Sequence, residues 1–221
     1  MIWTPVILSL QVATLATLCA LPLAVFVAYI LARKRFWGHG LLNGLVHLPL
    51  VLPPVVTGYL LLVVFGRQGA LGAVLYDWFG ITLAFRWTGA ALAAGIMGFP
   101  LMVRAIRLGF EAVDVGLEDA ARTLGASNLR VFAQVTLPLI GPAMIAGAVL
   151  GFAKALGEFG ATITFVAAIP GQTETIPSAI YAALQVPGQE GAVVWLVCIS
   201  IALAMGALIL SEWLARRMVA R

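Results

Sequence analysis

The charge-free stretch MIWTPVILSLQVATLATLCALPLAVFVAYILA, residues 1–32, decides the fold class of this chain. A helix of this length spans about 48 Å, which exceeds the roughly 30 Å hydrocarbon core of a bilayer. The basic triplet Arg33, Lys34 and Arg35 follows directly, and no basic region precedes the apolar stretch. We therefore expect a retained membrane span and not a cleavable signal peptide.

Further charge-free stretches recur along the chain. Only 10% of its 221 residues are charged and 62% are hydrophobic, whereas a soluble domain has about 25% charged residues. This excludes an ordinary soluble domain. The pattern predicts one all-α integral membrane domain over residues 1–221. Its five expected transmembrane helices lie near residues 5–32, 44–66, 87–108, 134–156 and 191–213.

The 13 Lys and Arg residues divide unevenly between the two sides of these spans. One side receives three of them, Arg67, Arg86 and Lys154. The other side receives ten, namely Arg33, Lys34, Arg35, Arg104, Arg107, Arg122, Arg130, Arg216, Arg217 and Arg221. Because cytoplasmic loops are enriched in Lys and Arg, the N-terminus is predicted to lie outside and the C-terminus in the cytoplasm.

Other apolar and polar features narrow the function. The run from Phe159 to Pro170 is too short to span a bilayer, so it predicts a re-entrant or buried segment. The histidines His39 and His47 are isolated, so we expect no metal site. No hydrolase or metalloprotease motif occurs, which makes a membrane enzyme the least favoured class. The basic residues behind the net charge of +4 form no stripe, so we expect no nucleic-acid partner. Membrane lipid is an expected partner.

The loop between the third and fourth expected spans is the most informative segment. Eight charges between residues 104 and 130 sum to zero. The spacing predicts a short helix with an apolar face, ended by Gly125 in the left-handed conformation, and a second helix capped by Ser127. Two interpretations stay open: a loop that covers the ends of the spans, and a docking element for a cytoplasmic partner. The expected apolar face consists of Val113, Leu117, Ala120, Ala121 and Leu124.

Two positions inside the apolar spans carry expectations from their chemistry. Pro49, Pro53 and Pro54 remove backbone donors, which predicts a kinked or broken second span that lines a pathway. Lys154 and Glu158 are four residues apart and share a helix face. We favour a structural salt bridge for this pair, with direct contact between Lys154 and an anion as the alternative.

The loop resembles the EAA signature of ABC importer permeases. The match runs from Asp119-Ala120-Ala121 through Gly125, nine residues on to Val135, and ends at Leu137-Pro138. Asp119 stands where the family has Glu, with Glu118 beside it, and Val135 replaces Ile. The resemblance implies that residues 109–133 couple a separate ATPase subunit to the spans. The implied coupling residues are Glu118, Asp119, Ala120, Ala121, Gly125, Leu137 and Pro138.

The chain's only lysines, Lys34 and Lys154, do not lie in a P-loop motif, so ATP hydrolysis through such a loop is expected in another polypeptide. Residues 47–59, 155–164 and 175–181 resemble the molybdate permeases within this family, with sulfate permeases as close relatives. The resemblance implies a type I importer (MetI-like) fold. It also implies a homodimer with two cytoplasmic ATP-binding subunits, which hold ATP and Mg, and a periplasmic molybdate-binding protein.

The resemblance places the chain in the bacterial inner membrane and implies that molybdate, with tungstate as a co-substrate, crosses through it. A sulfate or thiosulfate permease is the alternative, and an ion-coupled carrier or channel is a further one. From its position, the short outer segment Thr175–Gln185 is expected to form a helix where the binding protein docks. The residues implied for the pathway or gate are Pro49, Pro53, Pro54, Thr57, Gly157, Glu158, Phe159 and Thr162.

Overall fold

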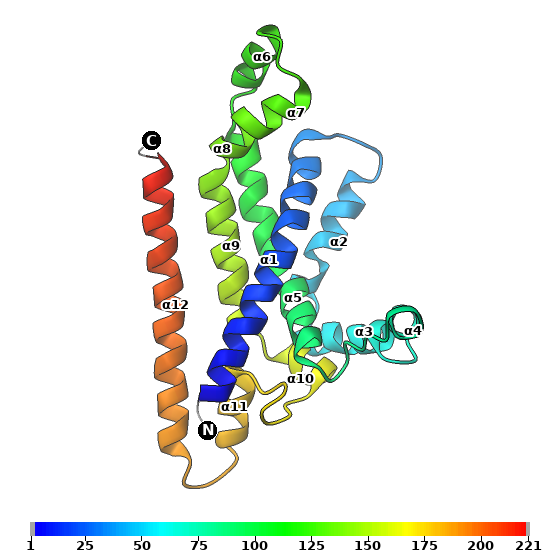
Figure 1. Ribbon diagram of the computed structural model, residues 1–221, viewed down its shortest axis with the longest axis vertical. Coiled ribbons are helices and arrows are strands. Elements are labelled where there is room, and N and C mark those ends of the chain that lie inside the picture. Colours follow the sequence, from blue (N-terminus) through cyan, green and yellow to red (C-terminus); the bar gives the residue numbers. More distant parts are fainter. Residues whose placement is uncertain (1–2, 220–221) are drawn as a thin grey trace.

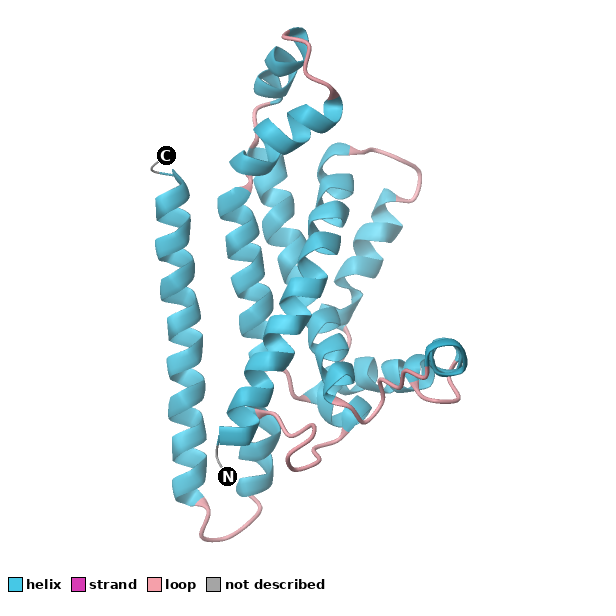
Figure 2. Ribbon diagram, viewed as in Figure 1, coloured by secondary structure: helices cyan, strands magenta, loops and turns pink. Residues whose placement is uncertain are grey.

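A computed structural model describes residues 3–219, which form helices joined by short loops, with no strand among them (Figures 1 and 2). Arg221, one of the ten basic residues assigned to the cytoplasmic side, lies outside these residues. In chain order the helices are α1 (Trp3–Arg33), α2 (His39–Val51), α3 (Pro54–Phe65), α4 (Ala70–Phe79), α5 (Trp87–Ala112), α6 (Val115–Thr123), α7 (Asn128–Val131), the π-helix η1 (Phe132–Thr136), α8 (Leu137–Leu139), α9 (Gly141–Leu156), α10 (Gly160–Val166), α11 (Ile176–Ala183) and α12 (Glu190–Val219).

Helices α1, α2, α5, α9 and α12 run along the long axis of the molecule (Figure 1). The α1–α2 loop, the pair α6 and α7, and the last turns of α12 gather at one end, here called the α6 end. The N-terminus, α10 and α11 lie at the opposite end, here called the α10 end. The first turns of α1 therefore lie at the end opposite to α6 and α7, and the last turns of α12 lie at the same end as α6 and α7.

Three helices, α1, α5 and α12, are long and apolar enough to cross a membrane by themselves. Two further crossings count only if bent helix pairs are each taken as one span, which gives up to five. The expected span over 44–66 is broken, as its prolines predict, whereas the bend in the expected span over 134–156 was not predicted. The first of these divides into α2 and α3, bent by 113°, and the second into Asn128–Leu139 and α9, bent by 65°.

Prolines explain both breaks. Leu52 and Pro53 each precede a proline and are extended, with ψ of 143° and 134°, because a following proline disfavours the helical region. The second break follows the π-helical turn 132–136 and lies between Pro138 and Pro142. A missing backbone donor at each proline interrupts the regular ladder there. As a result α3 and α4 project sideways from the bundle (Figure 2).

The helices α5 and α9 pack through glycines. A Cβ on Gly151 would lie 2.6 Å from Met102 Cγ, and one on Gly98 would lie 3.1 Å from the Gly151 carbonyl oxygen. The small-residue spacing of Gly147 and Gly151 predicts close helix approach but no partner, and the structure shows that the partner is α5. By contrast, a Cβ on Gly40 or Gly44 would have open space around it, so neither glycine marks a close helix approach within the chain.

Candidate functional site

Local capping forms the α6–α7 turn. Asp114 begins α6 and accepts a hydrogen bond of 2.8 Å from the Gly116 N–H. Gly125 has φ of 86°, and the Ala126 N–H donates to the Ala121 carbonyl at 3.1 Å, which completes a Schellman ending. Ser127 accepts from the Arg130 N–H at 3.4 Å and caps α7. The turn therefore has the glycine conformation and the serine cap that the sequence predicts.

The inner face of α6 differs from the expected apolar stripe. Glu118 is buried on this face, whereas Leu117 and Leu124 are exposed, Leu124 to 89%. Of the expected apolar face, Val113 is the residue that is buried, and it precedes α6. The leucines of the expected apolar face therefore lie on the outer side of α6, and a carboxylate with hydrogen-bond partners occupies its inner side.

Three side chains surround the Glu118 carboxylate. Thr136 donates to Oε1 at 2.8 Å, and Arg33 Nη2 lies 3.2 Å from the same oxygen. Arg122 Nη2 lies 3.6 Å from Oε2. Arg33 also donates to the Val113 carbonyl at 3.4 Å, while its Nε is buried without a partner. One carboxylate thus joins α6 to the end of α1 and to η1.

The neighbouring residue Asp119 touches this cluster only through Arg122. Its Oδ1 lies 2.6 Å from Arg122 Nη1, and its side chain is exposed. Ala120 is exposed as well, and Ala121 is partly exposed. The signature residues of α6 therefore form an outer surface, except for Glu118.

The later signature residues connect α6 to the bundle. Leu137 packs into the apolar cluster at the α6 end, and Pro138 is exposed at the start of α8. In the same cluster the Tyr29 ring contacts Phe110 and Phe132, with centroids 5.5 Å apart in each case. This aromatic group links α1, α5 and η1.

At the α10 end, seven of the eight expected pathway residues lie on α3, on α10 or in the residues directly before these two helices, which pack together. A Cβ on Gly58 would lie 2.5 Å from the Ala161 carbonyl oxygen, and one on Gly160 would lie 2.7 Å from Pro54 Cβ. Pro53 precedes α3 as its N-cap. The N-terminal ends of α3 and α10 therefore meet at Pro54 and Gly160. Thr57 is buried on α3, and its hydroxyl has no hydrogen-bond partner.

The expected contact between Lys154 and Glu158 is present, at 2.7 Å between Nζ and Oε2. The other oxygen of Glu158 accepts from the Ala161 N–H at 3.0 Å, so this carboxylate also caps α10. Thr162, four residues on, donates to the Phe159 carbonyl at 2.9 Å. Gly157 ends α9, and the Phe159 ring lies 5.2 Å from the Tyr181 ring on α11.

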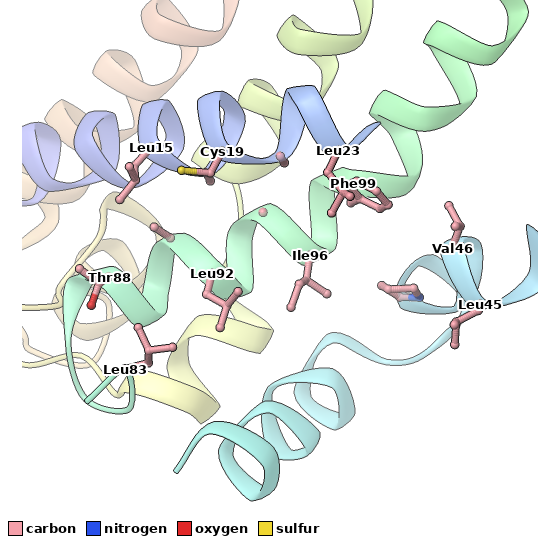
Figure 3. Close-up of a pocket in the computed structure, with 15 residues that line it drawn as sticks. Leu15, Cys19, Leu23, Leu45, Val46, Leu83, Thr88, Leu92, Ile96 and Phe99 are labelled. Carbon is pink, nitrogen blue, oxygen red and sulfur yellow. The ribbon is translucent and has the colours of Figure 1, made fainter. Parts of the chain in front are cut away.

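Pro49 is separate from this group. It lines an apolar cavity of about 620 Å³ between α1, α2 and α5. Figure 3 shows Leu15, Cys19 and Leu23 of α1 and Leu92 and Ile96 of α5 among the residues that line this cavity. A wall of this kind does not provide the donors that an oxyanion requires. Within residues 3–219, no three His, Cys, Asp or Glu side chains gather as metal ligands would.

Two residues of the α6-end site were not expected from the sequence. In the sequence, Arg33 is only one of the ten basic residues assigned to the cytoplasmic side. Thr136 is only the unspecified residue between Val135 and Leu137 in the signature. The available signal was the position of Arg33 as the last residue of a long apolar helix, where a cation faces the C-terminal end of the helix dipole. Its partner, 85 residues away, has no local signal.

A family profile described as "Binding-protein-dependent transport system inner membrane component" matches residues 20–220. The chain belongs to this family of transporter permeases. The molybdenum transport system permease protein ModB of Escherichia coli strain K12 is 62% identical over 97% of this chain and 93% of its own length. ModB of Haemophilus influenzae is 57% identical over 96% of this chain and 92% of its own.

A sulfate transport system permease protein, CysW of Synechococcus elongatus, is 40% identical over 68% of this chain and 52% of its own length. Among solved structures, the methionine transporter MetNI in an inward-facing form matches with a TM-score of 0.72 and 13% identity, over 98% of this chain and 94% of its own. A bacterial alginate ABC transporter in complex with its substrate-bound periplasmic protein matches with a TM-score of 0.74 and 16% identity, over 97% and 78%. These structures show the MetI-like fold of type I importer permeases.

Proposed function

We propose that the chain is the permease subunit of an ATP-driven importer that translocates molybdate across the bacterial inner membrane. The observation that carries this proposal is the 62% identity to a molybdenum permease over 97% of the chain. The sulfate permease relatives reach 34% and 40% identity over shorter portions. Tungstate is the expected co-substrate because it has the same charge and tetrahedral shape as molybdate. Sulfate or thiosulfate is the alternative cargo.

The outer surface of α6 and α7 is proposed to dock on a cytoplasmic ATPase subunit. Leu117, Leu124 and Leu129 expose an apolar ridge there, and the Asp119–Arg122 pair lies beside it. An apolar helix surface with a charged rim suits insertion into a groove of a partner. ATP and Mg bind that partner, and this chain supplies no cofactor ligands.

The α6 end is proposed to face the cytoplasm, with five membrane passages and the N-terminus outside. Ten of the 13 basic residues belong to that side by the sequence count. All six tryptophans are exposed, and they stand near the ends of the passages: Trp37 and Trp213 toward the α6 end, and Trp3, Trp78, Trp87 and Trp195 toward the α10 end. Tryptophan favours both membrane interfaces, which supports membrane passages between these two ends, and the Lys and Arg count sets their orientation.

The pathway is proposed to lie between two copies of the chain, with α3 and α10 as its gate at the α10 end. Five passages are few to enclose a route, and a two-fold dimer doubles them. The N-terminal end of α3, which meets α10 at Pro54 and Gly160, carries a positive helix dipole that favours an oxyanion. The unpartnered Thr57 hydroxyl lies on the same helix. A periplasmic molybdate-binding protein would dock at this end, near α11.

The substrate is tested in proteoliposomes that contain this chain, its ATPase subunit and its binding protein. We expect the molybdate-loaded binding protein to stimulate ATP hydrolysis more than the sulfate-loaded one. Equal or reversed stimulation would move the assignment to sulfate. Failure of the chain to copurify with a P-loop ATPase would instead favour an ion-coupled carrier.

A further inference from the structure

The helix α6 reaches the transmembrane helices by three routes, of which two follow the chain. Residues 113–114 join it to α5, and residues 124–127 join it to α7 and so to η1 and α9. The third route does not follow the chain. The ion pair between Arg33 and Glu118 connects α6 to α1, a membrane-crossing helix.

The geometry of this pair makes it a stiff connection. The side chains of Arg33 and Glu118 are 17% and 9% exposed, so water screens their attraction weakly. Arg33 Nη2 contacts Glu118 Oε1 at 3.2 Å and the Val113 carbonyl at 3.4 Å. Separating a buried ion pair leaves an uncompensated charge, which is far more costly than moving both partners together. A displacement of α6 is therefore expected to carry the end of α1 with it.

The contacts of the adjacent acid, Asp119, differ from those of Glu118. Asp119 is exposed and pairs with Arg122 of its own helix, so it exerts no pull on another helix. Thr136 of η1 donates to the same Glu118 oxygen that Arg33 contacts. One buried carboxylate thereby holds α1, α6 and η1 together, while the outer face of α6 stays free for docking.

We infer that Arg33 is a positioning residue that, through Glu118, transmits the movement of α6 into α1 during transport. The inference rests on the proposed docking of α6 to an ATPase. It assigns α1 a part in the conformational change, rather than the role of a static membrane anchor.

The test uses the reconstituted complex with its ATPase and binding protein, and compares Arg33→Gln with Arg107→Gln. Arg107 pairs with Glu111 and Asn43 on the outside of α5 and serves as the matched control. For Arg33→Gln we expect an assembled complex with unchanged basal ATP hydrolysis. Molybdate uptake per ATP should fall about 5-fold or more, the range of a coupling free energy between two sites. Arg107→Gln should transport like the wild type.

A second measurement separates transmission from simple stability. Arg33→Cys and Glu118→Cys are combined in a chain whose two native cysteines, Cys19 and Cys198, are replaced by alanine. The uncrosslinked chain should be uncoupled, and a short bis-maleimide, which alkylates both cysteine thiols and joins α1 to α6 without restoring any charge, should recover uptake. A role confined to charge satisfaction would show no recovery.

Two results overturn the inference while leaving the proposed function intact: wild-type coupling in Arg33→Gln, or no recovery on crosslinking an assembled complex. If Arg33→Gln does not assemble, the crosslinked cysteine pair decides between the same outcomes. A wild-type complex that molybdate-loaded binding protein does not stimulate would contradict the proposed function instead.

Discussion

Gly125 stands between α6 and α7 with φ of 86°, and no neighbouring atom lies within 4 Å of the place that its Cβ would occupy. Space is therefore not the reason for a glycine here. A residue with a Cβ adopts positive φ at a cost of about 1–3 kcal/mol, and β-branched residues adopt it least readily. The requirement is a property of the backbone.

The need for positive φ at Gly125 can be tested by substitution. Gly125→Val should uncouple or disassemble the complex because valine opposes the left-handed conformation, whereas Gly125→Asn should be milder because asparagine tolerates it. Assembly with the ATPase is measured by copurification, and coupling by uptake per ATP. Ala126→Val adds the same side chain one residue on and should behave like the wild type. Wild-type coupling in Gly125→Val would contradict our account of the turn.

The sequence does not predict which of the adjacent acids Glu118 and Asp119 is buried. A pattern of apolar residues predicts the helix and its ends, and both acids fall on it at neighbouring positions. Which carboxylate is buried depends on Arg33 and Thr136, which approach from α1 and η1. Side chains one residue apart on a helix diverge by about 100°, so only one of the two faces those partners.

Among the helices, α10 depends most on one residue. It has only seven residues, too few to be stable without tertiary contacts, and Glu158 caps it while pairing with Lys154. The cap alone contributes about 0.5–2 kcal/mol. Because α3 packs against α10 through Gly58 and Gly160, a loosened α10 would disturb α3 as well.

Glu158→Ala should therefore lower the thermal stability of the purified complex and impair uptake more than Lys154→Met does. Loss of Glu158 removes both the cap and the ion pair, while loss of Lys154 leaves the cap in place. Glu190→Gln is the matched control, since Glu190 also accepts from a backbone N–H but is exposed at the start of α12. Melting of each variant in detergent measures the effect. A larger defect in Lys154→Met would favour direct anion contact by the lysine instead.

The sequence predicts that the helix breaks between α2 and α3, but it does not predict the angle between them. Consecutive prolines at 53 and 54 force extended backbone at Leu52 and Pro53. The 113° angle brings α3 onto α10, and the contact of Gly58 with Ala161 joins segments about one hundred residues apart in sequence. Local rules predict where the helix stops, and packing decides where the next helix goes.

At the level of the whole molecule, orientation in the membrane can be measured directly. In a background without Cys19 and Cys198, Gln189→Cys lies in the exposed loop before α12 at the α10 end, and Trp37→Cys lies in the loop after α1 at the α6 end. An impermeant maleimide should label Gln189→Cys in intact cells and Trp37→Cys only after the inner membrane is permeabilised. The reverse pattern would invert the proposed topology.

Composition and local sequence pattern predict the membrane class, the distribution of charges between two ends, the break at Pro53 and Pro54 and the capped turn of the α6–α7 loop. These features depend on composition and on neighbours a few residues away, which any segment carries with it. The packing of the helices buries Glu118 against Arg33 and makes α5 the partner of Gly147 and Gly151. It also places Pro49 in the wall of an apolar cavity, apart from Thr57. Each of these depends on contacts between segments far apart in the chain, and such contacts form only when the helices pack.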